Sequence, residues 1–248
     1  MTWGVWEKTV GRDDLIPPEL LLETMRGLGY TATELGPPGY FSPELLERHG
    51  MTLVGGFAPL RFEDAEGYRS DVEEWLDPVI DVLRATGARG PVVLAGAELV
   101  GPHEPPTPAF FQRVNDAAER CRGRDVPVVF HHHAATYVES PQEIEALLEQ
   151  TDVGICYDSG HALAGGGDPV AVLRMCRDRV EHVHLKDVDP ASGVFCPFGE
   201  GAVDFDAVLA GLNGYDGWTV LEQDRVAVRV DDLEAVRAVE ERNLAVVA

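Results

Sequence analysis

The chain has 248 residues, of which 45% are hydrophobic and 25% are charged, a composition that excludes a disordered or fibrous protein. Its formal net charge of −23 comes from 43 acidic and 20 basic residues and repels polyphosphates and acidic membranes, so we expect no nucleic-acid and no membrane partner. No apolar run approaches the roughly 20 residues that span a bilayer and the first residues lack a signal-peptide pattern, so a cytoplasmic protein is expected.

The predicted elements alternate along the whole chain. Short runs rich in β-branched residues predict strands at 2–7, 31–36, 52–57, 91–96, 127–133, 153–158, 180–187 and 218–224. Helical patterns predict helices at 17–29, 42–50, 68–87, 107–124, 140–150, 168–179, 204–214 and 231–247. Several of these helices open with Ser or Asp followed by Pro and close near Gly, the usual punctuation of a helix.

This alternation predicts the fold class. Strand and helix recur eight times at intervals of about 30 residues, which is typical of an α/β protein with a (β/α)8 TIM barrel. No linker divides the chain, so we predict a single domain over residues 1–248. A doubly wound open sheet is the alternative, but its GxGxxG fingerprint is absent after the first predicted strand.

Polar side chains lie at the ends of several predicted strands. Parallel barrel strands bring their carboxyl ends to one mouth, and successive residues of a strand face opposite sides. If the apolar residues face the helices, one polar set faces the barrel interior. Its members are Glu34, His131 or His133, Asp158, His184, Lys186 and Glu222.

A bound metal ion explains this set economically. Buried carboxylates are costly without a cation, hydrogen bonds or water, and a mixed imidazole and carboxylate set suits several divalent ions. Each residue alone also has a simpler use. Asp158 caps a helix, Glu222 ends a solvated strand, His182 forms a hydrogen bond inside the barrel, Glu34 pairs with Lys186, and His132 is structural.

Two glycine-containing loops are expected beside these strand ends, at 159–169 and 198–206. Neither contains a phosphate-binding GxxxxGK[ST] pattern, so the glycine run at 165–167 predicts a mobile or tight turn. His161, in the first loop, is placed to meet a substrate, and exposure at the surface is the alternative. The four cysteines are far apart in sequence, without a CxxC pair, and are expected to be reduced structural thiols.

The segments TELG, HHH, YDSGH, HVHLKD, GEGAVDF and GWTVLEQD, in this order, carry a resemblance over nearly the whole chain. The chain resembles the sugar phosphate isomerase/epimerase superfamily of xylose isomerase-like TIM barrels, and within it the myo-inosose-2 dehydratases of inositol catabolism. The resemblance implies a divalent ion, Mn2+ or Co2+ first and Mg2+, Fe2+ or Zn2+ as alternatives. It places the metal ligands at His131, Asp158, His184 and Glu222, with His133 competing with His131.

The resemblance also implies a metal-dependent lyase that dehydrates a polyhydroxylated ketone such as an inosose. Glu34, His161, Lys186 and Glu222 are the candidate catalytic residues, and a small polyol or keto-sugar is the expected substrate. A sugar or cyclitol isomerase or epimerase is the alternative. Many superfamily members carry Glu where this chain has His131, and that difference disfavours an epimerisation by two symmetric glutamates. A carbohydrate-binding barrel without catalysis is a further alternative, and a homo-oligomer is left open.

Overall fold

The computed structural model describes residues 2–3, 17–35, 39–99, 103–223 and 233–247. The strands of its main sheet are β1 (Thr2–Trp3), β2 (Ala32–Leu35), β3 (Thr52–Leu60), β4 (Val92–Gly96), β5 (Val128–His131), β6 (Gly154–Asp158), β7 (Val180–Leu185) and β10 (Thr219–Gln223). They form one sheet in the order β1-β10-β7-β6-β5-β4-β3-β2, and neighbouring strands pair in parallel.

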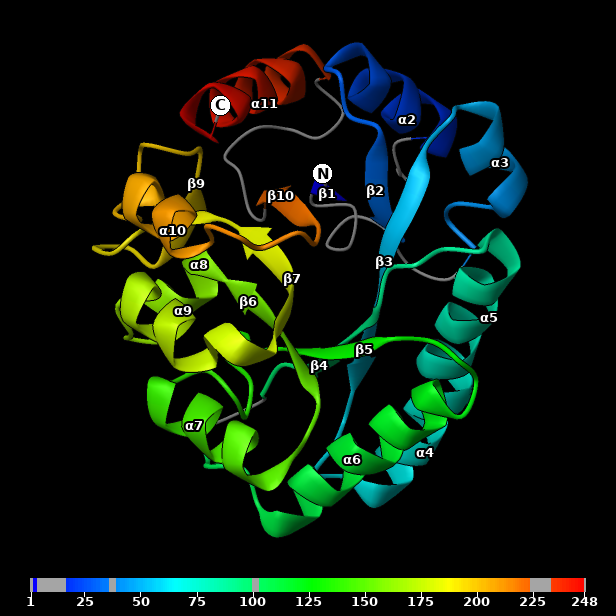
Figure 1. Cartoon of the computed structure of the whole chain (residues 1–248), viewed down its shortest axis with the longest axis vertical. Coiled ribbons are helices and arrows are strands. Elements are labelled where there is room, and N and C mark those ends of the chain that lie inside the picture. Colours follow the sequence, from blue (N-terminus) through cyan, green and yellow to red (C-terminus); the bar gives the residue numbers. More distant parts are fainter. Residues whose placement is uncertain (1, 4–16, 36–38, 100–102, 224–232, 248) are drawn as a thin grey trace.

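The helices lie outside this sheet, which curls into a barrel (Figure 1). They are α2 (Pro18–Gly27), α3 (Pro43–Arg48), α4 (Ala65–Asp71), η1 (Val72–Leu76), α5 (Asp77–Thr86), α6 (Pro108–Arg122), α7 (Pro141–Gln150), α8 (Ser159–Ala164), α9 (Pro169–Cys176), η2 (Arg177–Arg179), α10 (Phe205–Gly211) and α11 (Leu233–Val247). The predicted TIM barrel is therefore confirmed. Among the described residues, no helix combines the length and the apolar character needed to cross a membrane.

Three predicted helix starts, each marked by a Ser-Pro or Asp-Pro pair, are confirmed. The side chains of Ser42, Ser140 and Asp168 each accept a backbone N–H of the helix that follows, and a proline takes the next position. Ser140 forms a capping box with Glu143, because each side chain accepts the other residue's backbone N–H.

The structure differs from the predicted elements in four places. Strand β3 continues to Leu60, because Ala58 and Leu60 are fully buried and pair with β4. The expected helix at 68–87 is three helical segments, with a π-helical turn at η1 between α4 and α5. The expected loop at 159–169 begins as helix α8. A hairpin of β8 (Asp187–Asp189) and β9 (Val194–Cys196) follows β7, in a stretch for which no element was predicted after residue 187.

Several expectations extend beyond the described residues. Residues 4–7 of the first predicted strand, residue 36 of the second, residue 224 of the eighth and residues 231–232 of the last predicted helix lie outside them. That one domain spans residues 1–248 stays a prediction for the same reason.

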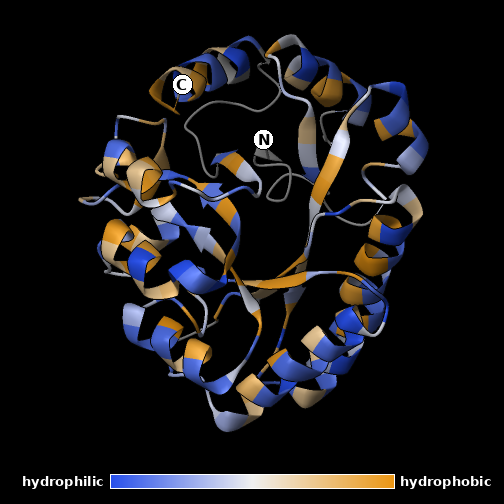
Figure 2. Cartoon of the chain, in the orientation of Figure 1, coloured by the Kyte–Doolittle hydropathy of each residue, from blue (hydrophilic) through white to orange (hydrophobic). Residues whose placement is uncertain are grey.

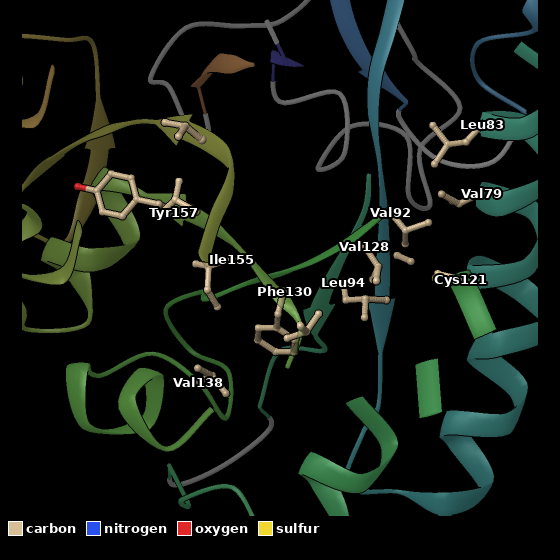
Figure 3. Packing of buried hydrophobic residues seen from close by; sticks show 14 of the residues in the cluster. Val79, Leu83, Val92, Leu94, Cys121, Val128, Phe130, Val138, Ile155 and Tyr157 are labelled. Carbon is tan, nitrogen blue, oxygen red and sulfur yellow. The ribbon is translucent and has the colours of Figure 1, made fainter. Parts of the chain in front are cut away.

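The hydrophobic core has two parts. The larger part lies between the outer face of the sheet and the helices, where Val92 and Val128 of the strands lie beside Val79 and Cys121 of the helices (Figure 3). Figure 2 shows that hydrophobic residues alternate with hydrophilic ones on the surrounding helices, as one-sided burial requires. The smaller part consists of two clusters: Ala32, Val54 and Val220, and Val93, Val129 and Cys156 with Phe57 against them.

This division confirms the predicted alternation of the late strands. Val128, Phe130, Val183, Leu185 and Leu221 all belong to the core beneath the helices. Their neighbours in sequence therefore face the barrel interior.

Candidate metal centre

Four predicted ligands meet at the carboxyl ends of their strands. His131 ends β5, Asp158 ends β6, His184 lies on β7 and Glu222 lies on β10. One ligand atom from each lies within 4.8 Å of those of the others. Nε2 of His131 is 3.2 Å from Oδ2 of Asp158, and Nδ1 of His184 is 2.7 Å from Oε2 of Glu222. Residues separated by up to 91 positions in sequence thus share one site.

Asp158 has both of the roles predicted for it, because it caps a helix and also belongs to the four-residue set. Its Oδ1 accepts the backbone N–H of His161 at 2.8 Å and so caps helix α8. Its Oδ2 faces His131 and His184. The backbone N–H of Asp158 donates to Nε2 of His132, which explains why His132 is buried on the other side of the strand. The carboxylate is therefore held rigidly at the strand end.

Buried atoms within the set fit a bound cation. Nδ1 of His131, Nδ1 of His184 and Oε2 of Glu222 make no hydrogen bond of acceptable geometry in the described part of the chain, although Oε2 of Glu222 lies 2.7 Å from Nδ1 of His184 and 3.0 Å from Nζ of Lys186. Buried polar atoms without such a bond are rare in folded proteins. Two imidazoles and two carboxylates form a donor set that divalent transition-metal ions accept. The residues present therefore fit a divalent ion.

His131, Asp158 and Glu222 have the protonation states of metal ligands. Burial lowers the pKa of His131 to about 3, so its ring is neutral near pH 7. Burial alone would raise the pKa of Asp158 and Glu222, but the Lys186 ammonium and nearby imidazoles outweigh it and hold both values low. Burial also opposes charge on His184, yet Cys156, Glu34 and Glu222 raise its pKa well above the usual value. In the absence of a cation His184 therefore holds a second ring proton, which a bound cation would replace.

Lys186 and His161 lie next to the metal-ligand set. Nζ of Lys186 is 3.0 Å from Oε2 of Glu222, 3.4 Å from Oδ2 of Asp158 and 2.9 Å from Nε2 of His161. Nδ1 of His161 accepts the backbone N–H of Ala134 at 3.1 Å. His161 is 1% exposed, so the alternative of a surface position is wrong.

Phe195 is a residue of this region that the sequence did not single out. Its ring centroid is 4.8 Å from that of His161 and 5.5 Å from Nζ of Lys186. Gly160 allows this packing, because a Cβ there would lie 2.5 Å from Cβ of Lys186 and 3.0 Å from Phe195. Phe195 was missed because it belongs to β9 of the unexpected hairpin.

Glu34 faces the interior as predicted, but its described partners lie on β7. Its Oε1 is 2.6 Å from Nε2 of His182 and 3.0 Å from Nε2 of His184. His182 thus forms the interior hydrogen bond that was the simpler reading of its position. Lys186, the other expected partner of Glu34, pairs with Asp158 and Glu222.

The geometry separates the two histidines that competed for the β5 ligand position. His131 is 1% exposed and belongs to the four-residue set. His133 stacks on His161 with ring centroids 3.7 Å apart, and its Nδ1 is 2.6 Å from the carbonyl oxygen of Ala134. The structure therefore brings His131, rather than His133, to Asp158 and His184.

The side chain of Asp187 holds the backbone of the GEGAVDF segment, residues 199–205. The buried carboxylate of Asp187 accepts the backbone N–H groups of Val188, Gly199, Gly201 and Val203. Gly201 needs to be glycine, since a Cβ there would lie 2.2 Å from Oδ1 of Asp187. The loop at 198–206, expected beside the strand ends, is thus anchored there by one carboxylate.

The fold is a parallel barrel with a set of histidines and carboxylates at its mouth. The chain matches the family model of xylose isomerase-like TIM barrels over residues 23–240. The chain belongs to the xylose isomerase-like TIM barrel family. It is 32% identical over 260 residues to an inosose dehydratase of Geobacillus kaustophilus (strain HTA426), covering 87% of this chain and 82% of that protein. It is also 32% identical over 253 residues to the rhizopine catabolism protein MocC of Rhizobium meliloti, covering 84% and 75%.

Solved structures show the same fold at lower identity. The crystal structure of the IOLI protein with a binding zinc atom superposes with a TM-score of 0.75 at 15% identity, covering 92% of each chain. At this identity the likeness concerns the fold, and the zinc atom belongs to that protein.

Proposed function

We propose that the protein is a metal-dependent dehydratase that acts on an inosose or a closely related polyhydroxylated ketone. The similarity to an inosose dehydratase over most of both chains supports this substrate class. The observation that carries the proposal is the meeting of His131, Asp158, His184 and Glu222 at the barrel mouth with buried atoms suited to a cation.

The same four residues are the proposed metal ligands. Mn2+ and Co2+ are our first choices from the resemblance; a set of two imidazoles and two carboxylates without thiolate also suits Mg2+, Fe2+ and Zn2+. When bound, such an ion supplies Lewis-acid polarisation of a substrate carbonyl.

The reaction breaks one C–H bond next to the carbonyl and one C–O bond at the β-carbon, forms a C=C bond and releases water. Glu222 remains a fixed ligand or accepts the α-proton. Lys186 and His161 are the candidates to give a proton to the departing hydroxyl, because they lie side by side next to Glu222 and Asp158. The backbone N–H of Ala134 donates to Nδ1 of His161, so the ring proton of neutral His161 lies on Nε2, 2.9 Å from Nζ of Lys186. A hydrogen bond between these two nitrogens requires that one of them gives up its proton, as a proton donor to the departing hydroxyl does.

Product mass provides the test. The purified protein is stripped of metal, reloaded with Mn2+, Co2+, Mg2+ or Zn2+ and incubated with scyllo-inosose and a panel of ketohexoses. We expect a product lighter by one water from inosose, formed only when the metal is present. A new sugar of unchanged mass would instead establish the alternative, an isomerase or epimerase, and ligand binding without turnover would establish a carbohydrate-binding protein.

A further inference from the structure

Glu34 reaches across the barrel to the back of a proposed metal ligand. It lies on β2, yet its Oε1 contacts two imidazoles of β7, 148 and 150 residues away in sequence. Its carboxylate is 5% exposed, so water does not replace these contacts easily. One oxygen atom therefore accepts from Nε2 of His182 and Nε2 of His184.

This contact decides which nitrogen of His184 can bind a metal. A neutral imidazole carries one N–H, and its other nitrogen has a free lone pair. When His184 is neutral, as a metal ligand must be, Nε2 donates to Glu34 and the lone pair therefore lies on Nδ1. Nδ1 is the atom that lies 2.7 Å from Oε2 of Glu222 and 3.9 Å from Oδ2 of Asp158. The side of the ring that faces the other ligands is thus the side left free to bind.

We propose that Glu34 is a positioning residue that holds His184 in the metal-binding tautomer and orientation, rather than an acid or base that touches the substrate. The proposal rests on the metal centre of the proposed function. A carboxylate that accepts the second N–H of a ligating histidine orients the ring and increases its basicity. The imidazole of His184 lies between Glu34 and the carboxylates of Glu222 and Asp158, which keeps Glu34 behind the site.

Two neighbours complete the support. His182 holds the same oxygen of Glu34 at 2.6 Å, so the carboxylate has two imidazole contacts on one atom. Gly55 provides the space, because a Cβ there would lie 2.9 Å from Oε1 of Glu34 and 3.5 Å from the carbonyl oxygen of Pro91. Because Gly55 on β3 has no side chain, the Glu34 carboxylate has room to reach His184 on β7.

The experiment measures Mn2+ affinity directly. Wild type, Glu34→Gln and Glu34→Ala are titrated with Mn2+ by calorimetry, and inosose turnover is followed as the Mn2+ concentration rises. We expect Mn2+ binding about 10- to 100-fold weaker in Glu34→Ala, and a smaller loss in Glu34→Gln, whose amide oxygen still accepts one N–H. Activity lost at low Mn2+ should recover as Mn2+ is raised.

Gly55→Ala tests the same contact by steric displacement, without changing a polar group, and should also weaken Mn2+ binding. Glu240→Gln is the matched control. Glu240 is a fully buried carboxylate of α11 that accepts the hydroxyl of Tyr30, so this variant should lose stability but bind Mn2+ as wild type does.

Wild-type Mn2+ affinity in both Glu34 variants, with activity that excess Mn2+ does not restore, would overturn the proposal and make Glu34 an acid or base. The binding measurement needs no substrate. If Mn2+ affinity depends on Glu34 but inosose is not dehydrated, the positioning role stands and the proposed function fails.

Discussion

The lower and upper halves of the barrel interior differ in chemistry although the same strands build both. On β2, β5 and β10 the inward residues change from Ala32, Val129 and Val220 to Glu34, His131 and Glu222, two positions further along each strand. On β6 the change is from Cys156 to Asp158. Since side chains on one face of a strand recur every second residue, each pair lies on the same face at successive levels.

On these four strands the level along the strand, and not the face alone, decides between packing and chemistry. Their lower level fills the barrel with apolar side chains, whereas β7 carries a histidine at both levels, His182 and His184. The upper level concentrates charged groups at the carboxyl ends, where the connecting loops approach. We expect that substitutions can disturb the two levels separately.

The largest effect is expected at Asp158. Asp158→Ala should lose bound Mn2+ and lower kcat/KM at least about 1000-fold, or about 4 kcal/mol, because it removes an oxygen ligand facing His131 and His184. Metal content by elemental analysis and turnover of inosose check this.

Asp168→Ala is the matched control for that variant. Asp168 caps α9 by accepting the N–H of Ala171, as Asp158 caps α8, but it has no part in the four-residue set. We expect a loss of about 1 kcal/mol of unfolding free energy with normal metal content. Normal metal in both variants would contradict the assignment of Asp158.

The next largest effect is on stability, at Asp187. Asp187→Ala should lower the unfolding free energy by about 3 kcal/mol, because four backbone N–H groups lose their acceptor at a buried position. Urea unfolding followed by circular dichroism measures it. Asp189→Ala, at an exposed turn where the carboxylate accepts from Ala191 and Ser192, should cost much less. Equal losses would show that the loop at 198–206 does not depend on Asp187.

Val129 tests the lower level of the same strand that carries His131. Val129→Ala should cost about 2 kcal/mol of stability, because it leaves a cavity in a fully buried cluster. Its Mn2+ affinity should match wild type, whereas His131→Ala should lose metal. Calorimetric titration of both variants checks the contrast, and a large loss of Mn2+ affinity in Val129→Ala would mean that the two levels are not separable.

The smallest effect is expected outside the barrel, at His103. Glu143 and Glu139 raise the pKa of His103 above its usual value, mainly through the contact with Glu143. The contribution of protonated His103 to the free energy of unfolding is therefore complete below the pKa of about 6.5 that His103 has in the unfolded chain. It is lost as pH rises through the higher pKa of the folded protein. Because the side chain is 34% exposed, we expect at most about 0.5 kcal/mol.

Urea unfolding of wild type and His103→Gln at about pH 5.5 and pH 9 measures this contribution. The difference between the two proteins should be larger at the lower pH. A difference that grows with pH would reverse the assigned sign.

Much of the fold and of the candidate metal centre could be predicted from the local pattern of apolar and polar residues in the sequence. Alternation along β5, β6 and β7 was enough to send Phe130, Ile155 and Val183 outward, since one face of each strand has to meet helices. Parallel strands then brought His131, Asp158 and His184 to one mouth. Helix α8 was not predicted, because its six residues include Gly160 and are too few for a clear period. The hairpin carrying Phe195 was missed because its strands have three residues each.

The sequence by itself determined which residues face the barrel interior and at which level, because these properties depend on the two-residue period of a strand and on where its apolar run ends. Only the tertiary structure decided how those residues pair. That Glu34 contacts His182 and His184, and that Lys186 contacts Asp158, Glu222 and His161, depends on distances across the barrel. Such distances are set by the packing of all the strands together, which no local pattern contains.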